Sequence, residues 1–386
     1  MFSQVFLSIV QREVKRIFSN KDLRLMCFFA PILYGIILTS TYYYGRLTKI
    51  PIGVIDLDHT QDSRTLLRNL DATENIKITN HYQTSQEANT DILNGEIEGF
   101  VVIPRNFSNR LKAGMDSTAF VSVSSSNFMI STPVITSFSD VVSSMSGKNI
   151  EFALNKKGVS WKKAESTKDI ITLKTDVAFN PALNYSNFMI PSLLYAILQQ
   201  VLMVALAFTF VEERQEGQLL NLFTKDKSQM LAVLLGKSFP YILINFFICI
   251  MFCYTLLPYF GLFPQSSFLV VALTSLIFVT AITSWGLFIS TFFKTTTATM
   301  IALMFYSMPT FLFSGVSWPT TAMNLPIKIV RFIFPSTYFL TDIRTLVLAK
   351  TPINYFLPSY TIMIFFALAS FIATFVIFKR MTTNQN

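Results

Sequence analysis

The stretch SFPYILINFFICIMFCYTLLPYFGLFPQSSFLVVALTSLIFVTAITSWGLFISTFF covers Ser238 to Phe293 without a single charged residue. A helix needs about 20 mainly apolar residues to cross the hydrocarbon core of a bilayer. These 56 residues are therefore long enough for two crossings. The segment from Pro258 to Pro264 contains two prolines and a glycine, which favour a turn. The stretch predicts two membrane-spanning helices joined by a short connection.

Four further runs without charge lie on either side of this stretch, at 25–45, 177–211, 295–327 and 351–378, and each predicts one span. The chain therefore has six predicted spans. Its composition, 52% hydrophobic and only 14% charged, excludes an ordinary soluble protein of this length. The first span, placed at 23–45, is too long for the apolar region of a signal peptide and lacks a small-x-small cleavage site, so we expect it to be retained.

The distribution of basic residues predicts the orientation. The region from Arg46 to Asp176 has 15 basic and 15 acidic residues, so the net charge of +9 comes from the rest of the chain. With a cytoplasmic N-terminus, twelve basic residues of that rest lie inside, and only Lys328, Arg331, Arg344 and Lys350 lie outside. The positive-inside rule therefore places both termini in the cytoplasm. The positive charge is explained without a nucleic-acid partner.

The first 22 residues predict an amphipathic helix at the cytoplasmic membrane surface. Gln4, Gln11, Arg12, Lys15 and Arg16 share one helical face. The opposite face is an apolar stripe made of Phe2, Val5, Phe6, Ile9, Val10, Val14, Ile17 and Phe18. Such a helix is expected to lie in the interface, with its stripe toward the lipid and its cations toward anionic headgroups.

Residues 46–184 predict an α/β domain inserted between the first two spans, on the extracytoplasmic side. IPIGVID (50–56), NIKITNHY (75–82) and GFVVIP (99–104) have the composition of short strands, and helical patterns separate them. TAFVSVSSS (118–126) alternates as a half-buried strand does. Residues 185–386 hold spans two to six.

The connection between spans two and three, 212–237, has an unusual density of charge. VEERQEGQLLNLFTKDK (211–227) contains four acidic and three basic residues. The acidic residues lie near the expected start of a helix and the lysines near its end, as the helix dipole favours. Leu219, Leu220, Leu222 and Phe223 would be exposed unless a partner covered them. The pattern predicts a protein-docking loop, with a merely solvated loop as the alternative.

This loop resembles that of the type-2 ATP-binding-cassette (ABC) export permeases, in which a Glu-Arg-Glu-x-Gly-Thr-like motif, a Leu-Leu continuation and a Gly-Lys pair precede the third span. Gln215, Gln218 and Lys225 depart from that pattern, Lys225 standing where a proline often follows a threonine such as Thr224. The resemblance implies that the loop docks on an ABC ATPase subunit and transmits its closure. The residues expected to couple the two subunits are Glu213, Arg214, Glu216, Gly217, Leu219, Leu220 and Lys237.

Two other parts of the chain extend the resemblance. IGVIDLDHTQDSRTLLRNL (52–70) and DILNGEIEGFVVIPRNFSNRL (91–111) are similar to the subgroup with a large extracytoplasmic domain. The segment 312–338 resembles the broken extracytoplasmic segment between spans five and six of the family. Its expected gate or helix-breaking residues are Gly315, Trp318, Pro319 and Pro335. Prolines interrupt helices, and irregular backbone at membrane depth must be buried or line a cavity, although an ordinary turn is the alternative.

We expect neither a catalytic nor a metal site in this chain. Its three cysteines lie in predicted spans, it has only two histidines, and no convergent ionisable cluster is evident. A Walker motif, GxxxxGK[ST], is also absent. The chain is therefore expected to bind no cofactor, and ATP and Mg are expected in the partner ATPase. Gln199 and Gln200 lie mid-span, where they line a path or bond a neighbouring helix.

The predicted fold is a membrane α-helical bundle of six transmembrane helices with an inserted α/β domain. The resemblance implies a permease subunit that exports an amphipathic drug-like, lipid-like or other small molecule across the bacterial inner membrane, powered by a separate ATPase. It also implies a second permease chain, as a homodimer or paralogous heterodimer, and leaves open a periplasmic adaptor. The alternatives are a membrane enzyme, and an envelope sensor or scaffold whose extracytoplasmic domain binds a ligand or partner without transport.

Overall fold

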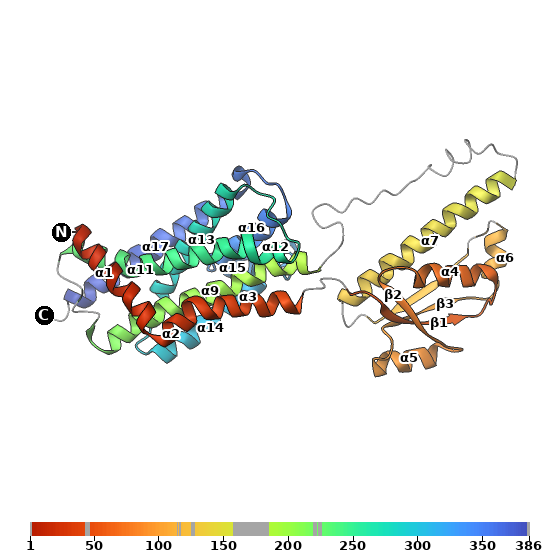
Figure 1. Cartoon of the computed structure of the whole chain (residues 1–386), viewed down its shortest axis with the longest axis horizontal. Helices are drawn as coiled ribbons and strands as arrows, with labels where there is room; N and C mark the ends of the chain where they lie inside the picture. Colours follow the sequence, from red (N-terminus) through yellow and green to blue (C-terminus); the bar gives the residue numbers. More distant parts are fainter. Residues whose placement is uncertain are drawn as a thin grey trace. The chain divides into compact units, whose positions relative to one another are not determined.

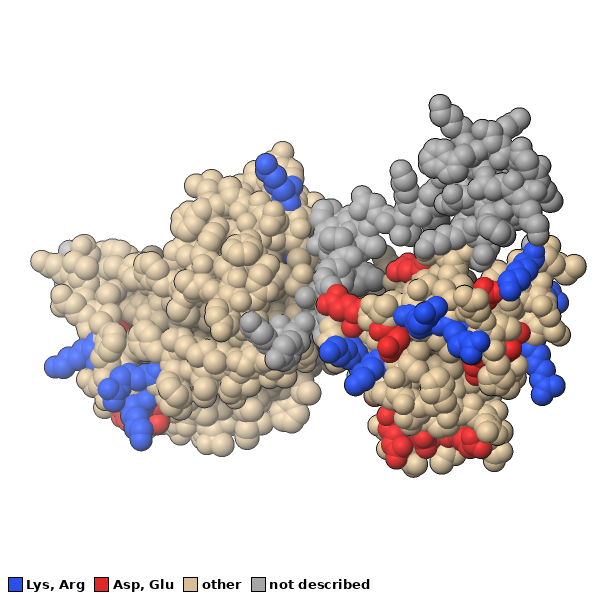
Figure 2. Space-filling view, turned by 45° about the vertical axis from the view of Figure 1, so that its right-hand side comes forward, with Lys and Arg blue, Asp and Glu red and all other residues tan. Residues whose placement is uncertain are grey.

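A computed structural model describes residues 2–42, 47–113, 115, 117–124, 128–156, 185–218, 222 and 226–383. The chain forms two compact units, Met1–Tyr43 with Ala178–Asn386, and Tyr44–Val177. The first is a bundle of long helices and the second an α/β unit (Figure 1). The visible face of the bundle carries few charged side chains, whereas that of the α/β unit carries many (Figure 2).

Among the described residues, six helical segments of the bundle are long and apolar enough to cross a membrane, as predicted. They are Lys21–Thr41 (α2, η1 and α3), Tyr185–Gln215 (α9), Lys227–Tyr259 (α11, η2 and α12), Phe268–Ser290 (α13), Thr296–Phe313 (α14) and Ile353–Thr382 (η4 and α17). The uncharged stretch divides into two helices, because the chain turns after Tyr259 and Gly261 adopts a positive φ of 74°. The chain is a multi-pass membrane protein.

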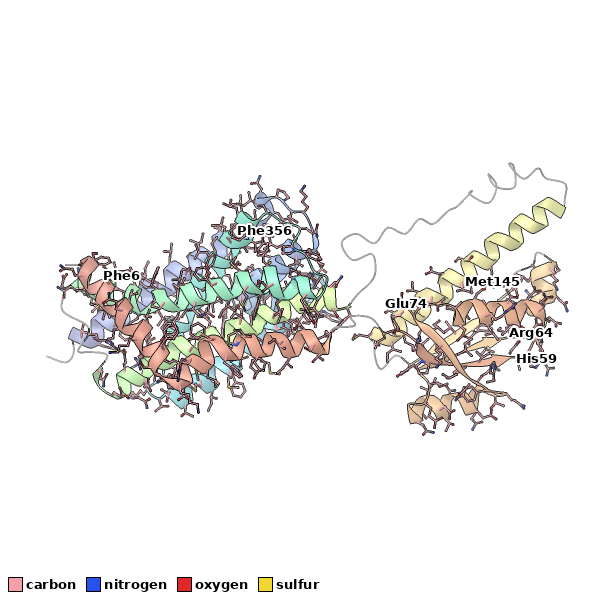
Figure 3. All side chains as sticks on the ribbon, in the orientation of Figure 1. Phe6, His59, Arg64, Glu74, Met145 and Phe356 are labelled. Atoms are coloured by element: carbon pink, nitrogen blue, oxygen red, sulfur yellow. The ribbon has the colours of Figure 1, made fainter. Side chains whose placement is uncertain are left out.

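The helix α1 (Phe2–Ser19) packs on α11 (Lys227–Met251), which differs from an apolar stripe directed wholly toward lipid. Ile9 and Ile17 are buried, and a Cβ at Gly236 would lie 3.0 Å from the Cβ of Ile9. Phe6 (Figure 3) meets Phe239 of α11 edge-on, with ring centroids 5.8 Å apart. Part of the predicted stripe remains exposed, namely Phe2, Val14 and Phe18.

The segment after α14 (Thr296–Phe313) does not continue as one helix. Gly315 has a φ of 90°, and Pro319 precedes the short turn η3 (Thr320–Ala322). Two helices follow, α15 (Leu325–Arg331) and α16 (Ser336–Leu348). The sequence pattern did not reveal α16, which is largely buried against α9 and α13 yet too short to cross a bilayer.

The α/β unit contains a sheet with strand order β2-β1-β3-β4. The strands β1 (Ile50–Asp56), β2 (Ile76–His81) and β3 (Gly99–Ile103) are parallel, and β4 (Phe120–Val123) is antiparallel to β3. The helices α4 (Gln61–Asp71) and α7 (Phe128–Lys156) cover one face, with α6 (Phe107–Lys112) beside them, and α5 (Ser85–Asn94) covers the other (Figure 1). Because both faces are covered, β1 has buried residues on both sides.

Candidate coupling site

The acidic residues of the predicted docking loop lie at the end of a helix, not at its start. Glu212 and Glu213 occupy the last turn of α9, which ends at Gln215. The expectation that they begin a new helix is therefore wrong, because α9 continues past the apolar run that marks the span. Carboxylates at a helix C-terminus meet the negative end of its dipole. Other charges must stabilise them.

Those charges come from α1 and α11 and form a buried ion cluster. Lys237 Nζ donates to Glu13 Oε1 at 2.7 Å and to Glu213 Oε2 at 2.6 Å. The side chains of these three residues are no more than 1% exposed. Arg12 and Arg16 both donate to Glu213 Oε1, and Arg16 also donates to Glu212. We define the ion cluster as Arg12, Glu13, Arg16, Glu212, Glu213 and Lys237.

Equal numbers of opposite charges explain how six charged side chains can lie together at one end of an apolar bundle. Three cations face three anions, so their formal charges cancel. Lys237 also lies over the ring of Phe210, with Nζ 4.9 Å from the centroid. Taking away one member of a buried pair leaves an uncompensated charge, at a cost of about 3–5 kcal/mol. The cluster therefore ties α1, α9 and α11 to one another.

A second set of contacts joins the end of α9 to the α13–α14 connection. Arg214 donates to the carbonyl oxygen of Thr291 at 3.1 Å. The side-chain oxygen of Gln215 accepts a hydrogen bond from the backbone N–H of Thr296 at 3.3 Å. The end of α9 therefore contacts α1 and α11 through the ion cluster, and the α13–α14 connection through these two residues.

An open polar cavity of about 400 Å³ lies beside the ion cluster. It is lined by Arg12, Lys15, Arg16, Ser19, Asn20, Glu212, Glu213, Glu216 and Gln218. Glu216 and Gly217 are exposed, and Gly217 turns the chain with a φ of 72°. Leu222 packs partly against the bundle core. The predicted docking residues Leu219 and Leu220 lie outside the described residues.

The predicted coupling residues thus separate into two groups. Glu213 and Lys237 are buried, so they position the end of α9 instead of presenting a surface. Glu216 and Gly217 are exposed. Sequence reasoning missed the role of Glu13, although the signal was present: Ile9, Glu13 and Ile17 recur every four residues on one helical face, which places an acid on the buried stripe.

The remaining predicted site residues lie apart from the ion cluster. Gln199 is 1% exposed, and neither its amide oxygen nor its nitrogen has a hydrogen-bond partner among the described residues. Gln200 is half-buried. Trp318 is 60% exposed. Gly315 and Pro319 form the turn after α14, and Pro335 precedes α16.

Residues 21–376 match the sequence profile of the ABC-2 family transporter proteins. The chain belongs to the ABC-2 family. Two relatives, from Escherichia coli K12 and O157:H7, are described as the probable multidrug ABC transporter permease YbhS and are 24% identical to it over 186 residues. That region is 48% of this chain and 49% of the relative, so the match spans about half of each.

Membership of the ABC-2 family makes this chain a transmembrane component of a transporter. Among the described residues, no group of three or more His, Cys, Asp or Glu side chains is arranged to hold a metal ion.

Proposed function

We propose that this ABC-2 permease exports an amphipathic drug-like, lipid-like or other small molecule across the bacterial inner membrane. The driving force is ATP hydrolysis in a separate subunit that holds ATP and Mg and docks on the 212–237 loop. The observation that carries this proposal is the ion cluster, since it fixes the end of α9, beside the loop, to two other helices. A rigid joint at that place suits the transfer of motion from a docked partner into the bundle.

The proposed orientation places the ion cluster in the cytoplasm and the α/β unit outside the membrane. The excess of basic residues on the α1 side supports it. In this arrangement Glu216, Gly217 and the adjoining Leu219 and Leu220 meet the ATPase, while Glu213 and Lys237 keep the joint rigid. The α/β unit then faces the periplasm, where an adaptor protein is an additional proposed partner.

The proposed assembly contains two permease chains, alike or paralogous, and two ATPase subunits. The turn at Gly315 to Pro319 and the exposed Trp318 lie at the proposed extracytoplasmic gate between the two permeases. Gln199, with its unpartnered buried amide, is a candidate for the substrate path. An amphipathic cargo agrees with the description of YbhS as a probable multidrug permease.

A matched pair of glycine variants tests the docking surface. Gly217 and Gly261 both have a positive φ, and a Cβ at either position meets no atom within 4 Å. A valine is equally strained in both backbones. We expect Gly217→Val to abolish the permease-dependent stimulation of the co-expressed ATPase, and Gly261→Val to retain it, with both chains inserted in the membrane.

Two results would contradict the proposal. Equal stimulation by Gly217→Val and the unaltered chain would show that the loop does not couple the subunits. Purification of the full-length chain from its native membrane without any ATPase would favour the alternative, a sensor or scaffold that binds a ligand or partner without transport.

A further inference from the structure

The helix α16 enters the bundle without crossing it. Its 13 residues are buried along most of their length, and they pack against α9, α13, α14 and α17. Phe339 stacks on Phe278 of α13 at 3.7 Å between centroids, and the hydroxyl of Ser192 of α9 donates to the carbonyl oxygen of Leu340 at 2.6 Å. These contacts hold α16 inside the protein at the end of the bundle far from the ion cluster.

Within α16 lies an acid with no countercharge. Asp342 is 5% exposed, and its Oδ2 has no hydrogen-bond partner among the described residues. Ser359 of α17 is the side chain that hydrogen-bonds it. None of the ion pairs found in the described part of the chain includes Asp342. An isolated ionised carboxylate is costly to bury, and such a group takes up a proton instead.

The charged groups near α16 do not alter this conclusion. Arg344, two residues further on, lies over the ring of Phe188 of α9 at 4.7 Å. Arg331 of α15 lies over the ring of Tyr338 at 5.4 Å. The other ionisable side chains of packed elements at this end are Tyr185 and Tyr195 of α9, Tyr306 of α14 and Tyr360 of α17, whereas α13 has none. Tyrosines are neutral below about pH 10.

Tyr360 extends the polar surroundings of Asp342. Its hydroxyl hydrogen-bonds Thr274 of α13, so a small polar layer joins α13, α16 and α17. These hydroxyl groups supply no positive charge. The hydrogen bond from Ser359 by itself lowers the pKa of Asp342, but burial without a countercharge outweighs it and favours the protonated acid.

We propose that Asp342 is a proton-binding site, and that α16 stays packed in the bundle while this carboxyl is neutral and loosens when it ionises. The inference concerns the chain alone and does not depend on the transport proposed above.

The sign of the response follows from the two states of α16. Burial raises the pKa of Asp342 to about 7 in the packed state, whereas a solvated aspartate has a pKa of about 3.9. Between these values the packed state holds a proton that the loosened state has lost. The equilibrium constant for loosening therefore rises by about tenfold per pH unit from about pH 4 to pH 7 and is constant above that range.

Infrared difference spectroscopy tests the proton directly. The purified full-length chain in lipid nanodiscs is titrated from pH 5 to pH 8.5. We expect the carbonyl band of a buried protonated carboxylic acid to disappear with a midpoint near pH 7, and to be absent at every pH in Asp342→Asn. The same band in Asp342→Asn, or no protonated-acid band in the unaltered chain at any pH of the titration, would overturn the assignment.

Hydrogen exchange of residues 336–348 tests the movement. After correction for the intrinsic pH dependence of exchange, the equilibrium constant for loosening in the unaltered chain is expected to rise about fiftyfold between pH 5 and pH 7, because the increase levels off near the pKa of the packed state. In Asp342→Asn the equilibrium constant for loosening is expected to stay at its low-pH value throughout. The control Asp22→Asn changes an exposed acid of α2, and its loosening is expected to depend on pH as that of the unaltered chain does. A variant Asp342→Asn that follows the unaltered chain, or that fails to fold, would refute the proposal, since Asn has the shape of the neutral acid.

Discussion

The two ends of the bundle bury ionisable groups in opposite ways. At one end, the ion cluster sets three cations against three anions, and Lys237 bridges Glu13 and Glu213. At the other end, Asp342 lies in α16 with a hydroxyl neighbour and no cation. A balanced cluster keeps its charges and acts as a joint between helices, whereas a lone acid exchanges its charge for a proton. The same low-dielectric interior thus strengthens the ion pairs of the ion cluster and favours protonation of Asp342.

The largest effect is expected when the ion cluster loses its central cation. Lys237→Met leaves the carboxylates of Glu13 and Glu213 in excess, and should lower the free energy of unfolding of the bundle by about 3–5 kcal/mol. Lys227→Met, at an exposed position of the same helix, is the control. Denaturant unfolding of the purified chain measures both.

A double variant sharpens the same comparison. Adding Glu13→Gln to Lys237→Met restores the balance of charge and should recover part of the lost stability. If Lys237→Met alone is as stable as the control, the charges of the ion cluster do not depend on one another, and the contrast with Asp342 fails.

A smaller effect on stability is expected in the α/β unit, and its dependence on pH is opposite to that expected for Asp342. Asp62 accepts a hydrogen bond from the hydroxyl of Ser108 and pairs with Lys112 at 3.2 Å. These contacts hold the pKa of Asp62 below its ordinary value. A lowered pKa contributes stability above the unfolded value of 3.8, and that stability is lost as the pH falls through the folded pKa.

Ser108→Ala tests this sign. It should weaken the contact of α6 with α4 by about 1.5–3 kcal/mol at pH 7, because the bond is to a charged group. Hydrogen exchange of residues 107–112 measures the loss, and the difference between variant and parent should shrink as the pH drops below 4. A difference that grows toward low pH would contradict the assignment, since only a raised pKa such as that of Asp342 gains stability on acidification.

The smallest effect concerns the close approach of α1 to α11. Gly→Ala in a helix interior ordinarily stabilises by roughly 0.5–1 kcal/mol. Gly286→Ala meets only ordinary contacts of 3.4 Å with Met203 and should show that gain. Gly236→Ala places its Cβ 3.0 Å from Ile9 and 3.1 Å from the carbonyl oxygen of Phe6, so the gain should be absent or reversed.

Thermal unfolding of the two alanine variants side by side measures the difference. An equal gain at both glycines would show that α1 is not held tightly on α11, and that the ion cluster can form without a close helix contact.

The membrane part of the fold was predictable because lipid imposes a simple rule. Long runs without charge are expected to be spans, and this expectation located the six segments found in the described part of the chain and the turn after Tyr259. The α/β region was predictable from its alternating strand patterns, and β1, β2 and β3 lie where those patterns placed them.

The candidate site was less predictable, because its members are distant in sequence. Glu13 and Lys237 are 224 residues apart, and no local pattern pairs them. The end of an apolar run also differs from the end of a helix, so α9 extended further than expected and carried Glu212 and Glu213 with it. The sequence did not indicate that Asp342 is buried, because α16 lies between two predicted spans and is buried only by the helices around it.

The 224-residue separation within the ion cluster also sets an order of events during synthesis. A ribosome adding about 5–20 residues per second needs roughly 10–45 seconds to extend the chain from Glu13 to Lys237. Throughout that interval the carboxylate of Glu13 in α1 lacks the ammonium group of Lys237, so it must remain solvated. Helix α1 is therefore among the last parts of the bundle to settle, although it is synthesised before α9 and α11.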